Sequence, residues 1–371
     1  MSKEPEKKPI QKTAAKEAQE PTEPKKPRKK GKILMAVIIL IAAVSVYLFP
    51  NWFEKQYKKI WGYYYVYKGD KAYKAAKYQK AVDYYLKGLE YYPEHSKARC
   101  NLGHLYVVFE NYYAAADAYD EALKYKPDYM SCRMDYGIIL SERLADYDKA
   151  VQEYGKIVEA RPFLLYIPFI YNNLKSVKEN RGLAYYNMGV AYRKKSIYMG
   201  ENTKISLMYL KKAKESYTNA QKMLPDDYDT HYNAAFTNQL LGNKKESGLE
   251  YCKAIEIRPY NFEAHYNYAL LLRSLKFYKE SLSELEKAGM LAELGADQTQ
   301  KEYIYEVLGE VKQILVNEGE IEFLNNRVEE SANDSSELAY RNGKVILKED
   351  ADKLLTKKLK QCPKKEYFEE L

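Results

Sequence analysis

The chain has 371 residues, enough for one large domain or two ordinary ones, and 30% of them are charged. Its formal net charge of +8 is concentrated at one end: residues 1–32 hold eleven Lys/Arg and five Asp/Glu, which leaves 49 basic and 47 acidic side chains in the other 339 residues. A nearly neutral body lacks the basic surface that binds phosphates, so we expect no nucleic-acid partner.

The chain begins with a basic segment, residues 1–32, that is predicted to be disordered. It contains five of the thirteen prolines and no aromatic residue, and such a composition cannot bury enough apolar surface to fold. An uncharged stretch then begins at Ile33 and ends at Phe49, and Pro50 follows it. Its helical length of about 26 Å is enough for the core of a bilayer. The sequence therefore predicts a transmembrane signal-anchor helix over residues 33–50.

The charges that flank this span predict its orientation. Six Lys/Arg lie within the eight residues before it, a heavier basic flank than the one that follows, so the N-terminal tail is expected in the cytoplasm. The rest of the chain is then expected outside the inner (cytoplasmic) membrane, which in a bacterium means the periplasm. A cleaved signal peptide is the alternative, because Ala43 and Ser45 can form a small-residue cleavage site.

Prolines recur at a fixed interval further along the chain. Pro93 and Pro127 lie 34 residues apart, and so do Pro225 and Pro259. Each ends the same pattern: a small residue, an aromatic residue four positions later and a second small residue three positions after that. The four copies are Ala81-Tyr85-Gly88, Ala115-Tyr119-Ala122, Ala213-Tyr217-Ala220 and Ser247-Tyr251-Ala254. Small residues let two antiparallel helices approach, the aromatic ring fills the groove beside them, and the proline ends the hairpin.

Two further copies bring the number of repeats to about six. Pro162 ends one of them, with Ala150 and Tyr154, and the last contains Leu285 but no proline. Residues 60–293 therefore resemble the tetratricopeptide-repeat family, whose unit is a 34-residue helix–turn–helix. The resemblance implies an all-α solenoid that binds other proteins along the surface lined by the first helix of each repeat.

The resemblance also divides the chain into parts. The apolar insertion between the third and fourth repeats is interpreted either as an extra helix that covers the array or as an exposed docking patch. The expected parts are repeats 1–3 at 60–162, the insertion at 163–182, repeats 4–6 at 183–293, a capping region at 294–330 with a helix at 298–317, and a helical tail at 331–371 with helices near 335–343 and 348–361.

Groove positions follow from the same resemblance. They include the residue just before the characteristic Asn of each first helix, the Asn itself, and a residue about one turn or more further on. In the second half of the array these positions combine tyrosine with arginine, the composition of binding hot spots. The predicted groove residues are Tyr186, Asn187, Arg193, Tyr232, Asn233, Phe236, Tyr266, Asn267 and Arg273. Chaperone-binding members clamp a carboxylate in their first repeats, but Asp70 here would repel one.

The sequence contains no motif typical of catalysis or of phosphate or calcium binding. We therefore expect no enzyme activity, no cofactor, no bound metal and no small-molecule substrate. The four cysteines include no Cys-x-x-Cys pair, which argues against zinc, although Cys100 and Cys132 fall on neighbouring helices and leave a disulfide open. His231 and His265 are 34 residues apart and could face one another, but two imidazoles without a nearby carboxylate or thiol make a poor metal site, so both are interpreted as packing residues.

These features together predict a membrane-anchored scaffold or adaptor that binds protein partners through its groove. The resemblance implies a role in assembling an envelope complex, such as a secretion, cell-envelope or periplasmic flagellar structure. The alternative is a protein-import receptor on an organelle surface with its repeats in the cytosol, which requires the basic flank to cross the membrane.

Overall fold

The computed structural model describes residues 29–160, 174–200, 203–319, 339–341, 344–346, 359–360 and 362. The chain divides into two compact units, Met1–Trp61 and Gly62–Leu371. Most of the predicted basic tail and the apolar stretch 163–171 lie outside the described residues.

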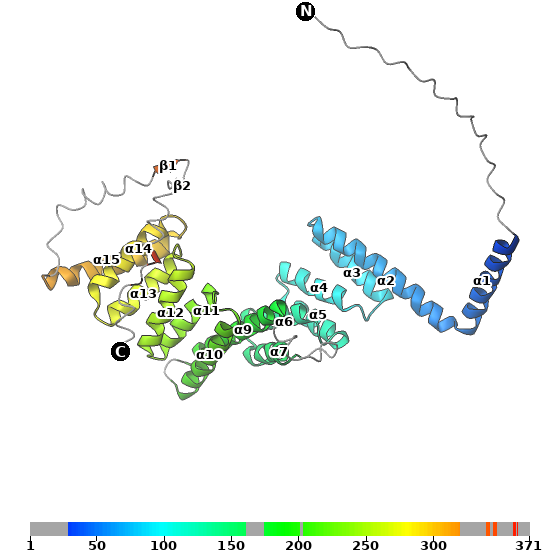
Figure 1. The fold of residues 1–371 in the computed structure, drawn as a ribbon, viewed down its shortest axis with the longest axis horizontal. Helices are drawn as coiled ribbons and strands as arrows, with labels where there is room; N and C mark the ends of the chain where they lie inside the picture. Colours follow the sequence, from blue (N-terminus) through cyan, green and yellow to red (C-terminus); the bar gives the residue numbers. More distant parts are fainter. Residues whose placement is uncertain are drawn as a thin grey trace, which may run out of the picture. The chain divides into compact units, whose positions relative to one another are not determined.

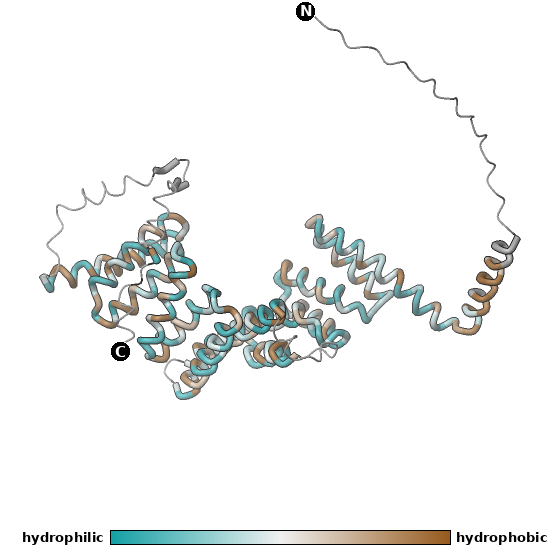
Figure 2. Tube along the Cα trace, in the orientation of Figure 1, coloured by the Kyte–Doolittle hydropathy of each residue, from teal (hydrophilic) through white to brown (hydrophobic). Residues whose placement is uncertain are grey.

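The first unit contains α1 (Lys29–Leu48) and the start of α2 (Pro50–Lys74). Apolar side chains of α1 from Leu34 onward are exposed on all sides, and Figure 2 shows the helix as a continuous apolar segment. Within the described residues, no single helix has both the length and the apolarity to cross a bilayer. Leu34–Leu48 and Pro50–Lys74 meet that criterion only as a pair with a sharp bend between them.

The second unit is a row of helical hairpins, as the 34-residue period predicts (Figure 1). The second helix of one hairpin packs against the first helix of the next, and the last hairpin packs against α15 (Gln298–Asn317), the helix predicted at 298–317. The six hairpins are α2 with α3 (Tyr78–Tyr91), α4 (Ser96–Val108) with α5 (Tyr112–Tyr125), α6 (Met130–Glu142) with α7 (Tyr147–Glu159), α9 (Lys175–Tyr198) with α10 (Lys204–Met223), α11 (Tyr228–Leu240) with α12 (Lys244–Ile257), and α13 (Phe262–Ser274) with α14 (Tyr278–Ala292).

The pattern tyrosines form the core of the hairpins. The side chains of Tyr85, Tyr119, Tyr154, Tyr217 and Tyr251 are at most 1% exposed. In the first four hairpins each ring lies against a glycine of the first helix, where a Cβ would overlap the ring; these glycines are Gly69, Gly103, Gly137 and Gly189. Glycine is thus required by the close approach of helix and ring rather than by backbone conformation.

In four of the hairpins, the residue six positions after the preceding proline is basic, and its side chain links the turn at that proline to the second helix of the hairpin. It donates a hydrogen bond to the carbonyl oxygen of that proline and pairs with a glutamate of the second helix. The sets are Arg99 with Pro93 and Glu121, Arg133 with Pro127 and Glu153, His231 with Pro225 and Glu250, and His265 with Pro259 and Glu284. The expectation that no carboxylate lies near His231 and His265 is therefore wrong, although both residues are buried, as their interpretation as packing residues requires. Each is bound within its own hairpin because the glutamate lies one helix further along the same repeat.

The His231 set predicts a pH-dependent stability. Its Nε2 lies 2.9 Å from the Pro225 oxygen and its Nδ1 2.6 Å from a Glu250 oxygen. Burial alone lowers the pKa of His231, but the hydrogen bonds with Glu250 and the Pro225 carbonyl outweigh it, so the pKa is raised. Because the folded-state pKa is raised, this stabilisation is complete below about pH 6.5, the ordinary His value, and is lost as the pH rises through the folded-state pKa.

We expect the melting temperature to fall with rising pH less steeply in a Glu250→Gln variant than in the unmodified protein, because glutamine keeps the side-chain shape but not the charge. Melting curves at pH values on both sides of the ordinary His value measure this difference. Identical pH profiles would show that His231 gains no proton on folding.

The C-terminal part differs from the expected helical tail. Residues 339–341 and 344–346 form β1 (Ala339–Arg341) and β2 (Lys344–Ile346), an antiparallel pair in which Tyr340 is opposite Val345. The helix predicted near 335–343 is therefore wrong. The two residues between the strands are Asn342 and Gly343, a dipeptide that favours a two-residue hairpin turn over a helix. Most of the helix predicted near 348–361 lies outside the described residues.

Two disulfides join parts that are distant in sequence. Cys100 on α4 is bonded to Cys132 on α6, with 5.9 Å between their Cα atoms, so the pairing that the sequence left open is present. Cys252 on α12 is bonded to Cys362, 110 residues further on, with a Cα–Cα distance of 5.4 Å. The second bond attaches the end of the chain to the fifth hairpin, where Leu359 is also buried.

Candidate protein-binding groove

The nine predicted groove residues lie on three first helices, α9, α11 and α13, and all are half-buried. The first helices of the fourth, fifth and sixth hairpins follow one another in the row, so a partner could contact them in succession. The structure does not bring all nine into one cluster. Some of them connect one hairpin to the next through hydrogen bonds, and Tyr266 and Arg273 lie where the sixth hairpin meets α15.

Hydrogen bonds from an asparagine of one hairpin to a tyrosine of the preceding hairpin link the groove residues. Asn233 Nδ2 donates to the Tyr186 hydroxyl oxygen at 3.3 Å, and Asn267 Nδ2 donates to the Tyr232 hydroxyl oxygen at 2.7 Å. Burial raises the pKa of both Tyr186 and Tyr232 to about 12, so both phenols stay protonated at neutral pH. Because each phenol oxygen already accepts a hydrogen bond, its proton can be donated to a carbonyl of a bound chain.

Arg193 completes the contact between α9 and α11. Its Nη2 donates to Asn233 Oδ1 at 3.0 Å, and its guanidinium carbon lies 5.4 Å from the centre of the Phe236 ring. Asn187 points back to the third hairpin, where its Nδ2 lies 3.4 Å from the sulfur of Met134. Each characteristic asparagine of this region therefore contacts the first helix of the preceding repeat.

Tyr266 and Arg273 are engaged with the capping helix instead. Arg273 forms a 2.7 Å ion pair with Glu310 of α15, and Tyr266 packs against the apolar cluster that contains Ile304 of the same helix. Arg273 also lines a hollow of about 410 Å³ between α13, α14 and α15, together with Leu270, Ser274, Tyr278 and Ile314. The helix α15 therefore covers part of the groove surface of the sixth hairpin.

The same line of polar residues continues into the first three hairpins, where Asn101 and Asp135 are the groove positions that the repeat pattern also predicts. Asp70 accepts hydrogen bonds from Asn101 at 3.1 Å and from Tyr85 at 2.7 Å. One repeat further on, His104 Nε2 lies 2.8 Å from an Asp135 oxygen. Asn101 and Asp135 occupy the characteristic Asn position, so the 34-residue spacing indicates both as groove positions, whereas only the structure identifies their hydrogen-bond partners.

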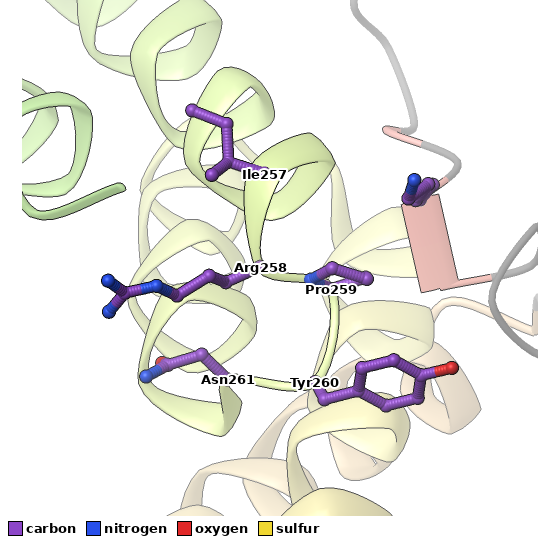
Figure 3. Close-up of a pocket in the computed structure, with 6 residues that line it drawn as sticks. Ile257, Arg258, Pro259, Tyr260 and Asn261 are labelled. Atoms are coloured by element: carbon purple, nitrogen blue, oxygen red, sulfur yellow. The ribbon is translucent and has the colours of Figure 1, made fainter. Parts of the chain in front are cut away.

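A second hollow, of about 520 Å³, lies at the turn between α12 and α13 and is not part of the groove. Figure 3 shows Arg258 and Asn261 directed to one side of the turn and Tyr260 to the other. Lys360 completes the lining, next to the cysteine that anchors the C-terminal segment. The hollow is therefore the junction between that segment and the fifth hairpin.

The repeat pattern of this chain is also found in known proteins. The family model described as tetratricopeptide repeat matches residues 68–128 and 100–164. No curated protein sequence matches the chain.

Among solved structures, PilF of Pseudomonas aeruginosa is 15% identical, covers 67% of this chain and 99% of its own, and has a TM-score of 0.49. MamA from Desulfovibrio magneticus RS-1, residues 41 to the end, is 17% identical and covers 53% of this chain and 94% of its own, with a TM-score of 0.42. YrrB, described as a TPR protein with an unusual peptide-binding site, is 20% identical and covers 57% of this chain and 90% of its own, with a TM-score of 0.42. Residues 68–164 of this chain are therefore tetratricopeptide repeats, and the stacked hairpins with their glycine–tyrosine packing continue the same pattern beyond them.

Proposed function

We propose that this protein is a membrane-anchored scaffold that holds protein partners along the first helices of its fourth to sixth hairpins and takes part in assembling an envelope complex. Tetratricopeptide repeats are protein-interaction scaffolds, and the repeats occupy most of the described chain. A secretion, cell-envelope or periplasmic flagellar structure would each provide partners of this kind.

The row of half-buried tyrosines carries the proposal. Tyr186 and Tyr232 are held in place by asparagines of the next repeat, so a partner binds to rings that have already lost their conformational freedom. Half-buried tyrosine beside arginine is typical of binding hot spots, because the ring provides apolar contact while the hydroxyl and guanidinium provide hydrogen bonds. Such a surface suits an extended peptide or a helix of a partner protein.

The exposed apolar surface of α1 supports the membrane anchor, and the dense basic cluster at 25–32 supports a cytoplasmic N-terminus. Both disulfides lie in the second unit. Disulfides persist in oxidising compartments and are rare in the cytosol, which favours an extracytoplasmic location for the repeats. We therefore propose a single-pass protein of the inner membrane with its repeats in the periplasm.

The proposal is tested by crosslinking in intact cells followed by affinity capture of the full chain. We expect a Tyr232→Ala/Tyr266→Ala variant to lose partners that the unmodified protein captures, since truncating a hot-spot residue costs about 2 kcal/mol or more of binding free energy. A Tyr113→Ala/Tyr303→Ala variant is the matched control, because it removes two exposed tyrosines from α5 and α15 instead of from first helices. Tyr232→Phe, which keeps the ring, separates a loss of packing from a loss of the hydroxyl.

Unchanged capture by the groove variant would contradict the groove assignment, provided that circular dichroism shows the same helix content as the unmodified protein. Loss of the same partners in the control variant would mean that binding does not depend on the groove.

The alternative, a protein-import receptor on an organelle surface, keeps the groove and reverses the topology. Its repeats would face the cytosol, where both disulfides would be reduced. Protease added to bacterial spheroplasts with an intact inner membrane distinguishes the two topologies. It cleaves periplasmic repeats and spares the basic tail, whereas in the reversed topology it cleaves the tail and spares the repeats.

A further inference from the structure

Four potential metal ligands meet on the neighbouring first helices α4 and α6. Cys100 and His104 are four residues apart on α4, and Cys132 and Asp135 are three residues apart on α6, so each pair lies on one face of its helix. The Cys100–Cys132 disulfide joins the two pairs. No linear zinc motif is present, because the two halves of the set come from different repeats.

These side chains lie close enough together for one metal ion to bind them after small side-chain rotations. His104 Nε2 lies 2.8 Å from Asp135 Oδ2 and 4.0 Å from Cys100 Sγ. The potential ligand atoms of Cys100, His104 and Asp135 all lie within 4.8 Å of one another, and among the described residues no other group of three or more such side chains does so. Ligand atoms around tetrahedral zinc are separated by roughly 3–4 Å, given bonds of about 2.0–2.3 Å.

The burial of the four residues also suits a metal. Cys100 and Cys132 are at most 1% exposed, whereas the side chains of His104 and Asp135 are 36% and 39% exposed. Thiolates in the interior need a positive charge to remain ionised, and the half-exposed histidine and carboxylate leave an entry path for the ion. Among the described residues, the second disulfide, Cys252–Cys362, has no such pair of companions.

We propose that Cys100, His104, Cys132 and Asp135 form a zinc-binding site when the disulfide is reduced, so that the disulfide and a bound Zn²⁺ are alternative links between the second and third hairpins. A thiol or phosphine reductant supplies two electrons to the S–S bond, and the two sulfurs take up two protons. Zn²⁺ then displaces these protons and binds two thiolate sulfurs, one imidazole nitrogen and one carboxylate oxygen. Reoxidation by a small-molecule disulfide, which takes up the two electrons and leaves as two thiols, would release the ion, because a disulfide sulfur is not a thiolate ligand.

The experiment uses the full chain in detergent, with zinc added before and after reduction by a phosphine. We expect the reduced protein to retain one Zn²⁺ per chain after gel filtration, measured by elemental analysis, and the oxidised protein to retain none. With Co²⁺ in place of Zn²⁺, a thiolate-to-metal charge-transfer band should appear only after reduction. His104→Ala and Asp135→Ala should each weaken zinc binding by more than about tenfold, since losing even a residue that only orients a ligand costs that much.

The matched control is Cys252→Ser/Cys362→Ser, which removes the other pair of thiols and should leave zinc binding unchanged. The proposal fails if the reduced protein retains no zinc, if the oxidised protein retains as much, or if the zinc is lost in this control. Undiminished binding by both His104→Ala and Asp135→Ala would also overturn it. Circular dichroism of each variant shows whether the helices are intact, and the half-exposed positions of His104 and Asp135 make loss of folding an unexpected cause.

Discussion

Replacing Gly189 with alanine is expected to destabilise the protein by about 1–3 kcal/mol. A Cβ at this position would lie 2.6 Å from the nearest ring carbon of Tyr217, and two more ring carbons would lie within 2.8 Å. The Tyr217 side chain is fully buried between α9 and α10, so its ring cannot move aside without disturbing the hairpin. Thermal and denaturant unfolding of the full chain measure the loss.

The control for this substitution is Gly155→Ala in α7. Gly155 is also inside a helix, but no described atom outside that helix would come within 4 Å of its Cβ. Alanine there should stabilise the protein by about 0.5–1 kcal/mol, because it lowers the conformational entropy that the helix must lose. The two substitutions are identical in chemistry and opposite in expected sign. Stabilisation by Gly189→Ala would show that the ring does not require glycine.

Replacing Arg133 with methionine is expected to cost about 3 kcal/mol or more, because it leaves a buried carboxylate without its main partner. Arg133 and Glu153 form an ion pair between α6 and α7, and each residue is only 5% exposed. Arg133 also donates a hydrogen bond of 2.6 Å to the Pro127 carbonyl, which links the pair to the preceding turn. Lys156, whose Nζ lies 2.6 Å from Glu153 in the unmodified protein, is retained in the variant and should limit the loss.

The double variant Arg133→Met/Glu153→Leu tests the cause of that loss. Removing both charges eliminates the buried carboxylate, so most of the stability should return. Lys124→Met is the surface control, since Lys124 is 60% exposed beside Glu121 and such pairs contribute about 1 kcal/mol or less. A double variant as unstable as Arg133→Met would mean that the packing of the arginine side chain matters, and not the ion pair.

The sequence alone determined the hairpins and the packing of the two helices within each of them. The 34-residue period indicates where many of the helices begin and end, because prolines follow second helices and Asn111, Asp146, Asp227 and Asn261 accept hydrogen bonds at helix N-termini. It does not predict the start of α9 at Lys175, which lies within the predicted insertion. The small and aromatic residues of each repeat lie on one helix face, so their packing against the partner helix follows from helix geometry. The helix at 298–317 followed for the same reason, since an end repeat must be covered.

Contacts between repeats were decided only by the tertiary structure. The sequence placed Tyr232 and Asn267 on equivalent faces of two helices, but the stagger between those helices decides that their side chains form a hydrogen bond. His231 illustrates the same limit, because equivalence to His265 suggested a contact between repeats, whereas each imidazole binds a glutamate of its own hairpin. Periodicity fixes directions around a single helix axis, whereas contact across helices depends on their separation and offset, which no one-dimensional pattern contains.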